Sequence, residues 1–253
     1  MTKKAPVAID PSLEMKIHGL NACMALFKGR PSALVRLYLA EKRLKLLTDV
    51  VKHCVERKLA YHVVSDEELE KVSEASHHEG VCMVIRRKKR VSESELKVLA
   101  QGPGQWLALE EVENPHNLGA IVRSAAHFGV KGILLMGKKQ NWQNGAFYRT
   151  AEGGAESVAI VAVENWVEFK ELTTKLDLTV MATSSHDGDK LYESILPERS
   201  LFLIGAEGRG LSTEAFKKAE VLLQIPGTGE VESLNVSTAT ALLIGEWYRQ
   251  HHK

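Results

Sequence analysis

The sequence predicts an α/β protein with two regions, and three observations support this prediction. The 253 residues are 44% hydrophobic and 26% charged, which is ordinary usage for a folded globular protein. From residue 106 onward, short apolar runs rich in β-branched residues alternate with amphipathic stretches. Of the 19 glycines, only Gly19, Gly29 and Gly80 precede residue 100. The chain therefore changes character near Gly102, and tight turns concentrate in its second region.

The first region reads as a small α/β unit. Its hydrophobic patterns alternate between a period close to 3.6 residues and a period of 2, as expected for helices and strands. Asp66 is a plausible N-cap for a short helix because Glu70 lies nearby. The predicted elements are a helix at 13–28, a strand at 34–39, a helix at 44–58, a strand at 60–64, a short helix from residue 66 and a strand at 80–85.

The second region reads as a mostly parallel sheet covered by helices on both faces, because buried parallel strands are short and continuously apolar. In such sheets, ligands bind beyond the carboxyl ends of the strands. The predicted strands are 106–112, 132–136, 158–163, 178–183, 201–206 and 221–225, and the predicted helices are 117–128, 164–176, 212–219 and 233–250.

Residues 89–104 read as a linker, and the charge balance changes sign there. Residues 1–103 hold 19 Lys and Arg against 13 Asp and Glu, whereas the rest of the chain holds 14 against 19. A basic first half favours a polyanionic partner, although solvated helix faces explain the same excess. The run Arg86 to Arg90 is open to the same two interpretations, a phosphate contact or a solvated stretch.

Several classes of protein are excluded by composition. No apolar window is long enough for a membrane span, and the first residues lack the apolar core of a signal peptide. Cys23, Cys54 and Cys82 are odd in number and widely spaced, which argues against a disulfide framework and for a reducing, cytoplasmic location. The adjacent His77 and His78 have no third ligand near them in sequence, so we expect no metal site.

The first informative turn is N-P-H-N-L-G-A-I-V-R-S-A at residues 114–125. Asn117 is placed to cap a helix whose buried stripe contains the apolar residues that follow it. Arg123 lies about 140° from the centre of that stripe, so it points away from the core. Taken alone, such an arginine is usually a solvent-facing residue.

Two further turns follow predicted strands. The turn I-G-A-E-G-R-G-L-S at residues 204–212 lacks the glycine spacing of a dinucleotide fold, and Glu207 would repel a pyrophosphate. An anionic turn suits a cationic or hydroxyl-rich ligand. In the turn I-P-G-T-G-E-V-E-S-L-N-V-S at residues 225–237, Ser233 is placed to cap the last helix, and Ser233 and Asn235 are either plain cap and turn residues or ligand contacts.

These three motifs, in this order and at these separations, resemble those of the SpoU (TrmH-like) branch of the SPOUT RNA methyltransferases over about residues 105–250. The first region resembles the L30e-like substrate-binding domain of the ribosomal RNA members over residues 14–88, on the motifs I-H-G-L-N-A at 17–22 and H-E-G-V at 78–81. The domains implied are residues 14–88, the linker 89–104 and a catalytic domain at 105–253.

The resemblance implies a ribose 2'-O-methyltransferase that uses S-adenosylmethionine, carries a C-terminal trefoil knot, needs no metal and works as a homodimer. The reaction centre implied is Asn117, Arg123, Glu207, Ser233 and Asn235. The cofactor contacts implied are Thr183, Gly205, Ala206, Glu207, Gly208, Ile225, Pro226, Ser233, Leu234 and Asn235. From charge and domain order, we expect RNA contacts at Arg30, Arg36, Arg86, Arg87 and Arg123, with ribosomal RNA favoured over transfer RNA.

A hydroxyl is a weak nucleophile, so methyl transfer to it needs a group that accepts its proton or stabilises the developing alkoxide. Arginine keeps its proton at neutral pH, so we expect Arg123 to position a phosphate and stabilise the oxyanion. Proton loss to phosphate or to Glu207 stays open. The competing hypothesis is a catalytically silent RNA-binding or assembly factor on the same fold, and a nucleotide-dependent oxidoreductase comes third.

Overall fold

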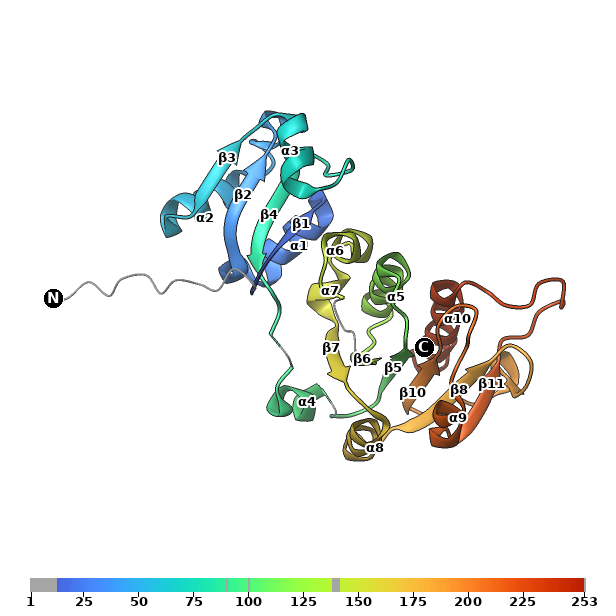
Figure 1. The fold of residues 1–253 in the computed structure, drawn as a ribbon. Helices are drawn as coiled ribbons and strands as arrows, with labels where there is room; N and C mark the ends of the chain where they lie inside the picture. The colour runs from blue at the N-terminus through green and yellow to red at the C-terminus, as the bar shows by residue number, and fades with distance from the viewer. Residues whose placement is uncertain (1–12, 90, 100, 138–141, 253) are drawn as a thin grey trace. The chain divides into compact units, whose positions relative to one another are not determined.

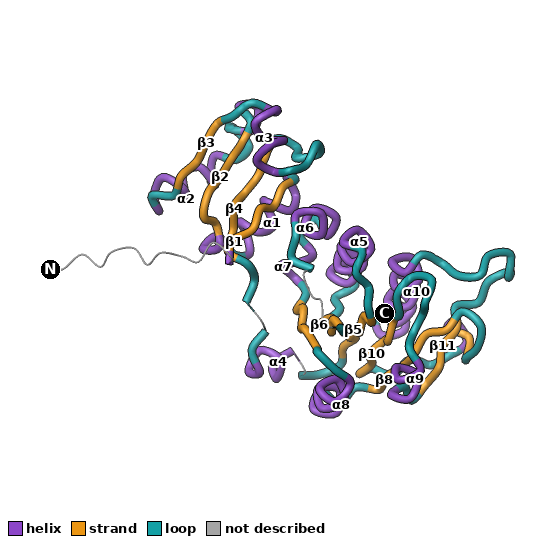
Figure 2. The backbone as a smooth tube through the Cα atoms, in the orientation of Figure 1, coloured by secondary structure: helices purple, strands orange, loops and turns teal. Residues whose placement is uncertain are grey.

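The computed structural model describes residues 13–89, 91–99, 101–137 and 142–252. The chain divides into two compact units (Figures 1 and 2). The first contains residues 1–89 together with 143–149, and the second contains residues 90–142 and 150–253. Among the described residues, no helix combines the length and apolar character needed to cross a bilayer.

Within its described residues, the first unit contains a four-stranded sheet and helices that pack on it. The strands lie in the order β1-β4-β2-β3, with β2 and β3 parallel and the other neighbours antiparallel. The elements in chain order are β1 (Glu14–His18), α1 (Leu20–Gly29), β2 (Leu34–Leu39), α2 (Thr48–Arg57), β3 (Ala60–Val63), α3 (Asp66–Ser73) and β4 (Val81–Arg86).

One prediction for this unit was wrong. Residues 13–28 were expected to form a single helix, but they form β1 followed by α1. In β1, Met15 and Ile17 are buried while Lys16 between them is exposed, which is the period of a strand. Gly19 then adopts φ 92°, a left-handed conformation that ends the strand and admits the turn into α1.

The short helix α3 begins as predicted at residue 66, but its N-cap is Ser65 rather than Asp66. The Ser65 hydroxyl accepts from the backbone N–H of Glu68, and the Glu68 carboxylate accepts from the backbone N–H of Ser65. This reciprocal pair is a capping box.

The three cysteines are all buried and free, and burial raises the pKa of the Cys82 thiol to about 12.

The second unit is a seven-stranded sheet in the order β7-β6-β5-β10-β8-β11-β9, and all of its pairings are parallel. This confirms the predicted α/β class. Its elements are α4 (Glu93–Leu99), β5 (Gly104–Glu110), α5 (Pro115–His127), β6 (Gly132–Met136), α6 (Gly145–Ala151), α7 (Gly154–Ser157), β7 (Ala159–Val163), α8 (Trp166–Lys175), β8 (Thr179–Ser184), β9 (Asp189–Lys190), β10 (Arg199–Ile204), α9 (Thr213–Lys218), β11 (Val221–Gln224) and α10 (Val236–His251). Residues 145–149 of α6 cluster with the first unit.

Helices cover both faces of this sheet (Figure 1). On one face, a cluster built from Trp106, Leu134 and Leu203 packs against Phe169 of α8 and Ala215 of α9. The helices α5 and α10 pack against each other, and α10 also contacts β10. The segment predicted as a linker contains α4, whose Leu96 is buried in the same cluster as Trp106.

Candidate active site

Three turns leave the carboxyl ends of strands that lie close together in the sheet. They follow β5, β10 and β11, and the strand order places β5 beside β10 with only β8 between β10 and β11. Because all these strands are parallel, their carboxyl ends meet at one edge. The three sequence motifs therefore converge at one place in the second unit.

Side chains from the three motifs form one hydrogen-bonded network. The Asn117 amide donates to Glu207 Oε2 at 2.9 Å, and the Asn235 amide donates to Glu207 Oε1 at 2.7 Å. Asn235 Nδ2 also lies 3.1 Å from Asn117 Oδ1. Asn117 lies 90 positions and Asn235 lies 28 positions from Glu207 in the sequence, yet both donate to its carboxylate.

The helix α5 presents Asn117 differently from the sequence expectation. Its N-cap is Asn114, whose side chain accepts from the backbone N–H groups of His116 and Asn117, and Pro115 occupies the first helical position. Asn117 was expected to be the cap. Because Asn114 has that role, the amide of Asn117 is available to reach Glu207.

The cap of α10 also differs from the expectation. Asn235, not Ser233, is the N-cap, and its Oδ1 accepts from both the backbone N–H and the hydroxyl of Ser237. Asn235 therefore uses its oxygen to fix the start of α10 and its nitrogen to hold Glu207. The two interpretations of Asn235, a helix cap and a member of the site, are compatible.

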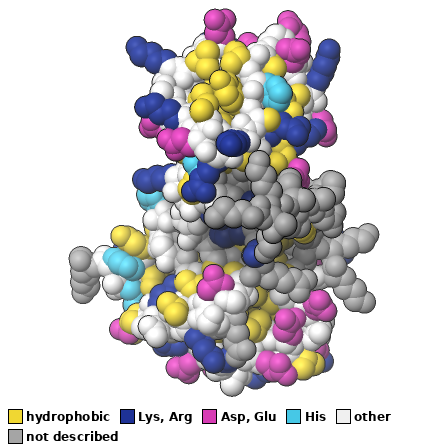
Figure 3. Space-filling model, turned by 90° about the vertical axis from the view of Figure 1, so that its left-hand side faces the viewer, with side chains coloured by type: hydrophobic (Ala, Val, Ile, Leu, Met, Phe, Trp, Pro, Cys, Tyr) yellow, Lys and Arg dark blue, Asp and Glu magenta, His cyan; other side chains and the backbone are white. Residues whose placement is uncertain are grey.

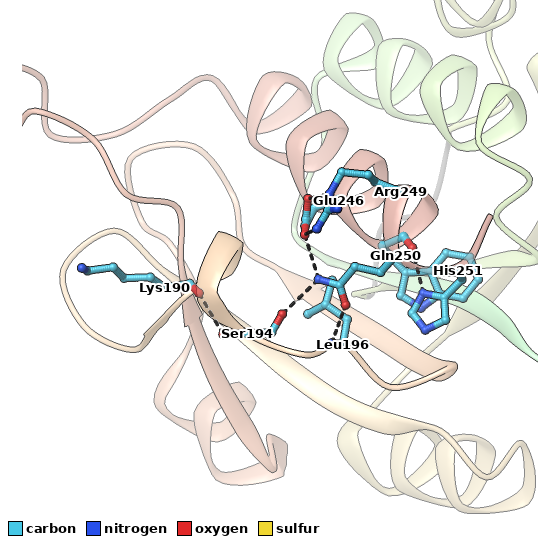
Figure 4. Close-up of polar contacts among 8 residues, drawn as sticks. Lys190, Ser194, Leu196, Glu246, Arg249, Gln250 and His251 are labelled. Atoms are coloured by element: carbon cyan, nitrogen blue, oxygen red, sulfur yellow. Dashed lines mark hydrogen bonds and ion pairs between the residues drawn. The ribbon is translucent and has the colours of Figure 1, made fainter. Parts of the chain in front are cut away.

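The far end of α10 is anchored as well (Figure 4). Gln250 accepts from the backbone N–H of Leu196 and donates to the carbonyl of Ser194, and it also donates to Glu246. Trp247 donates from its indole N–H to the carbonyl of Pro197. These contacts connect the helix that begins at Asn235 to the segment that precedes β10.

The turn at 205–212 is closed on itself. A Cβ atom on Gly205 would lie 2.1 Å from the carbonyl carbon of Gly210, so only glycine fits there. Residues Ala206 and Gly210 form an isolated bridge. Glu110, the last residue of β5, accepts from the backbone N–H of Ser212 at 2.8 Å and from its hydroxyl at 2.6 Å.

Sequence reasoning missed Glu110. No local signal marked it, because the strand was predicted to run over 106–112, whereas β5 ends at Glu110. Its carboxylate holds Ser212, which is the N-cap of α9. Glu110 therefore fixes the far end of the turn that carries Glu207.

Arg123 lies where its helical position predicts. Leu118, Ile121 and Val122 are buried, whereas the side chain of Arg123 is 58% exposed. Its Nη1 pairs with Oε1 of Glu152 at 3.0 Å. Glu152 was not singled out from the sequence, and it adopts a left-handed backbone conformation with φ 44° just after α6.

The remaining residues expected to contact a cofactor divide between strand ends and open loop. The hydroxyl of Thr183, in β8, donates to the carbonyl of Leu203 at 3.0 Å. Gly208 adopts φ 76° within the 205–212 turn. The loop from Pro226 to Asn235 is exposed throughout and includes Ser233 and Leu234, while Ile225 before it is half-buried.

The four arginines expected to contact RNA in the first unit lie on its sheet and adjoining loops. Arg36 donates to the hydroxyl of Tyr38, and this hydrogen bond raises the pKa of Arg36. Arg30 donates to the carbonyl of Arg86, and Arg87 donates to that of Gln143.

His78 is buried and accepts from the backbone N–H of Gly80. Within the described ranges, no group of three or more His, Cys, Asp or Glu residues is arranged to hold a metal ion.

A parallel α/β sheet with three converging turns and a polar network at its carboxyl edge has the layout of an α/β ligand-binding site. The chain superposes with a TM-score of 0.80 on the S-adenosylmethionine-bound rRNA methyltransferase of Sinorhizobium meliloti, at 23% identity over 96% of this chain and 90% of that one. That likeness establishes the fold.

Residues 105–245 match the model of the SpoU rRNA methylase family, and residues 16–91 match that of the RNA 2'-O ribose methyltransferase substrate-binding domain. The chain belongs to the SpoU family. It is 38% identical to the uncharacterized tRNA/rRNA methyltransferase YfiF of Escherichia coli O157:H7 over 96% of this chain and 72% of that protein. It is 29% identical to the 23S rRNA (guanosine-2'-O-)-methyltransferase RlmB of Photorhabdus laumondii over 92% of this chain and 97% of that protein.

Proposed function

We propose that this protein transfers a methyl group from S-adenosylmethionine to a ribose 2'-hydroxyl of RNA, with ribosomal RNA as the substrate class. The network of Asn117, Glu207 and Asn235 carries the proposal, because it joins the three family motifs at one carboxylate. The relative RlmB is named as a 23S rRNA enzyme and shares nearly the full two-unit length. That shared length favours ribosomal RNA over transfer RNA.

The residues at the sheet edge fit S-adenosylmethionine in their chemistry. The cofactor is cationic at sulfur, and the exposed carboxylate of Glu207 attracts a cation and repels a pyrophosphate. The missing Cβ of Gly205 lets the backbone of Gly210 pack against it, and this closes the turn that carries Glu207. We propose that the cofactor is held by the backbone and side chains of Gly205, Ala206, Glu207, Gly208, Ile225, Pro226, Ser233, Leu234 and Asn235, with Thr183 beside them. When bound, the cofactor supplies an electrophilic methyl group, and the proposed chemistry needs no metal.

The side chains of the site prepare the hydroxyl for that methyl group. Arg123 keeps its proton and presents a planar set of donors, so in our proposal it positions the phosphate next to the target ribose and stabilises the developing oxyanion. In the free protein Glu152 holds the Arg123 guanidinium. The hydroxyl proton passes to that phosphate or to Glu207, while Asn117, Ser233 and Asn235 orient the reacting groups.

Methyl transfer to RNA tests the proposal directly. Purified protein is incubated with radiolabelled S-adenosylmethionine and ribosomal RNA from cells that lack the gene. A 2'-O-methyl group blocks alkaline cleavage at its own nucleotide, so we expect label in alkali-resistant dinucleotides. Label that alkali releases as mononucleotides would contradict ribose methylation.

The variant Arg123→Ala separates catalysis from cofactor binding. We expect methyl transfer to fall about 100-fold or more, since the lost interaction stabilises the transition state, while cofactor affinity stays within about twofold. Single-turnover rates and calorimetry measure the two quantities. Equal losses in both would make Arg123 a structural residue. No transfer by the wild-type protein, with RNA binding intact, would favour a silent RNA-binding or assembly factor.

The remaining assignments belong to the same proposal. Residues 14–88 are the RNA substrate-binding domain of L30e type, 89–104 the linker and 105–253 the catalytic domain with its C-terminal knot. Arg30, Arg36, Arg86 and Arg87 contact RNA phosphates. The catalytic domain forms a homodimer, and light scattering of the purified chain checks this through its molar mass. The protein works in the cytoplasm.

A further inference from the structure

One face of the sheet in the first unit is partly open. Register places Lys16, Val84, Arg36 and Ala60 side by side across the four strands, and Arg36 and Ala60 are exposed. The next row along the same face is covered by α3, where Leu69 packs with Cys82 and Tyr38. Among the described residues, a partly exposed strip therefore runs across the sheet beside α3.

Two aromatic side chains stack at the border of this strip. Tyr38 and His62 are register partners on β2 and β3, with ring centroids 5.0 Å apart and planes inclined by 19°. β3 is the edge strand of the sheet, and its four residues are exposed. The stack therefore ends at His62, and among the described strands none follows β3 on that side.

One cationic side chain contacts the stack, and two more lie further along the sheet. Arg36 lies two residues before Tyr38 and donates to its hydroxyl at 3.2 Å. Arg86 is the last residue of β4, four residues beyond the register partner of Tyr38, and Arg30 at the end of α1 donates to its carbonyl. Figure 3 looks onto the left-hand side of Figure 1, and on the first unit it shows hydrophobic, basic and histidine side chains close together.

We propose that His62 is a base-stacking residue for single-stranded RNA, so that an unpaired base continues the Tyr38–His62 stack beyond the edge of the sheet while Arg36 contacts the backbone. This inference rests on the proposed function, because RNA is the substrate there. An unpaired base offers a free π-face, and stacking on an aromatic ring is tolerant of sequence. A base paired within a helix has no such face to offer.

The neighbouring residue provides a matched control. Tyr61 is also aromatic and 40% exposed, but successive side chains of a strand point to opposite faces, so Tyr61 lies on the other side of the sheet. If RNA binding needed only an exposed ring on β3, Tyr61→Ala and His62→Ala would weaken it equally. If it needs the proposed stack, only His62→Ala weakens it.

The experiment measures binding of a fluorescently labelled oligoadenylate of 12 nucleotides by anisotropy, at several salt concentrations. We expect His62→Ala to weaken binding about tenfold, and His62→Phe and Tyr61→Ala to leave it within about twofold. Arg36→Ala should lower the slope of log affinity against log salt by about 0.7, the share of one phosphate contact to a single strand. His62→Ala should leave that slope unchanged.

Three results would overturn the stacking site. These are equal weakening by His62→Ala and Tyr61→Ala, loss of binding in His62→Phe equal to that in His62→Ala, and no binding of the oligonucleotide by the wild-type protein. Calorimetry with S-adenosylmethionine on the same preparations keeps the two proposals apart, because His62 lies outside the cofactor site. If any of these results is found while cofactor binding and methyl transfer persist, the stacking site is refuted and the proposed function stands.

Discussion

The two turns that carry Glu207 and Asn235 differ in how the protein holds them. The turn at 205–212 is closed by a bridge between Ala206 and Gly210 and by the two hydrogen bonds from Ser212 to Glu110. The loop at 226–235 is exposed along its whole length and is fixed mainly at its end, where Asn235 caps α10. One half of the site is thus built by the protein itself, whereas the other half offers exposed groups to a ligand.

This difference indicates that the two segments have different roles in ligand binding. A turn that is already closed pays little ordering entropy when a ligand binds, whereas an exposed loop gains contacts only when something packs on it. The carboxylate of Glu207 therefore has a fixed place before the cofactor arrives, and the 226–235 loop completes the site around it. Substitutions in the two segments should differ accordingly.

The largest difference in stability is expected between substitutions at two glycines, one in each segment. In Gly205→Ala the new methyl group would lie 2.1 Å from a backbone carbon and 2.4 Å from the backbone nitrogen of Leu211, so the turn must shift, at a cost of about 3 kcal/mol. In Gly227→Ala nothing lies within 4 Å. We expect its stability to stay within about 0.5 kcal/mol of wild type. Urea unfolding followed by circular dichroism measures both, and equal destabilisation would refute the contrast.

A smaller contrast is expected between adjacent glutamates. Glu110→Gln leaves one acceptor oxygen for the two donors of Ser212, so we expect a loss of about 1.5 kcal/mol in the closure of the turn. Glu111→Gln removes only the exposed ion pair with Arg209, which contributes at most a few tenths of a kcal/mol. Amide hydrogen exchange over residues 205–212 should speed up about tenfold in the first variant and stay unchanged in the second. Similar exchange in both would show that Glu110 does not hold the turn.

Much of the fold was accessible from the sequence because buried parallel strands leave a strong signal. The strands predicted at 34–39 and 132–136 match the structure residue for residue, and others shift by one or two positions at their ends. The predicted helix at 13–28 failed because Leu13, Ile17 and Leu20 also lie at helical spacing, although the residues from 13 to 17 alternate as in a strand. The helices α4, α6 and α7 are short, and their apolar residues are too few to set a period.

The site was only partly accessible, for a geometric reason. Periodicity placed Arg123 on the outer side of α5, and the structure confirms its exposure. That Asn117, Glu207 and Asn235 meet was implied only by the family resemblance, because residues so far apart in sequence have no local signal of contact. Glu110 and Glu152 act through their partners, Ser212 and Arg123, so nothing in their own neighbourhood marked them.

Calorimetric titration with S-adenosylmethionine tests the central claim most directly. The comparison is between Asn235→Ala and Asn165→Ala, since the side chain of Asn165 also caps a helix, α8, by accepting from backbone N–H groups, but lies outside the network. Both variants lose about 1 kcal/mol of helix capping. We expect micromolar binding in the wild-type protein and in Asn165→Ala, and at least tenfold weaker binding in Asn235→Ala. Equal affinities in all three proteins, or no binding at millimolar cofactor, would contradict a cofactor site at the three converging turns.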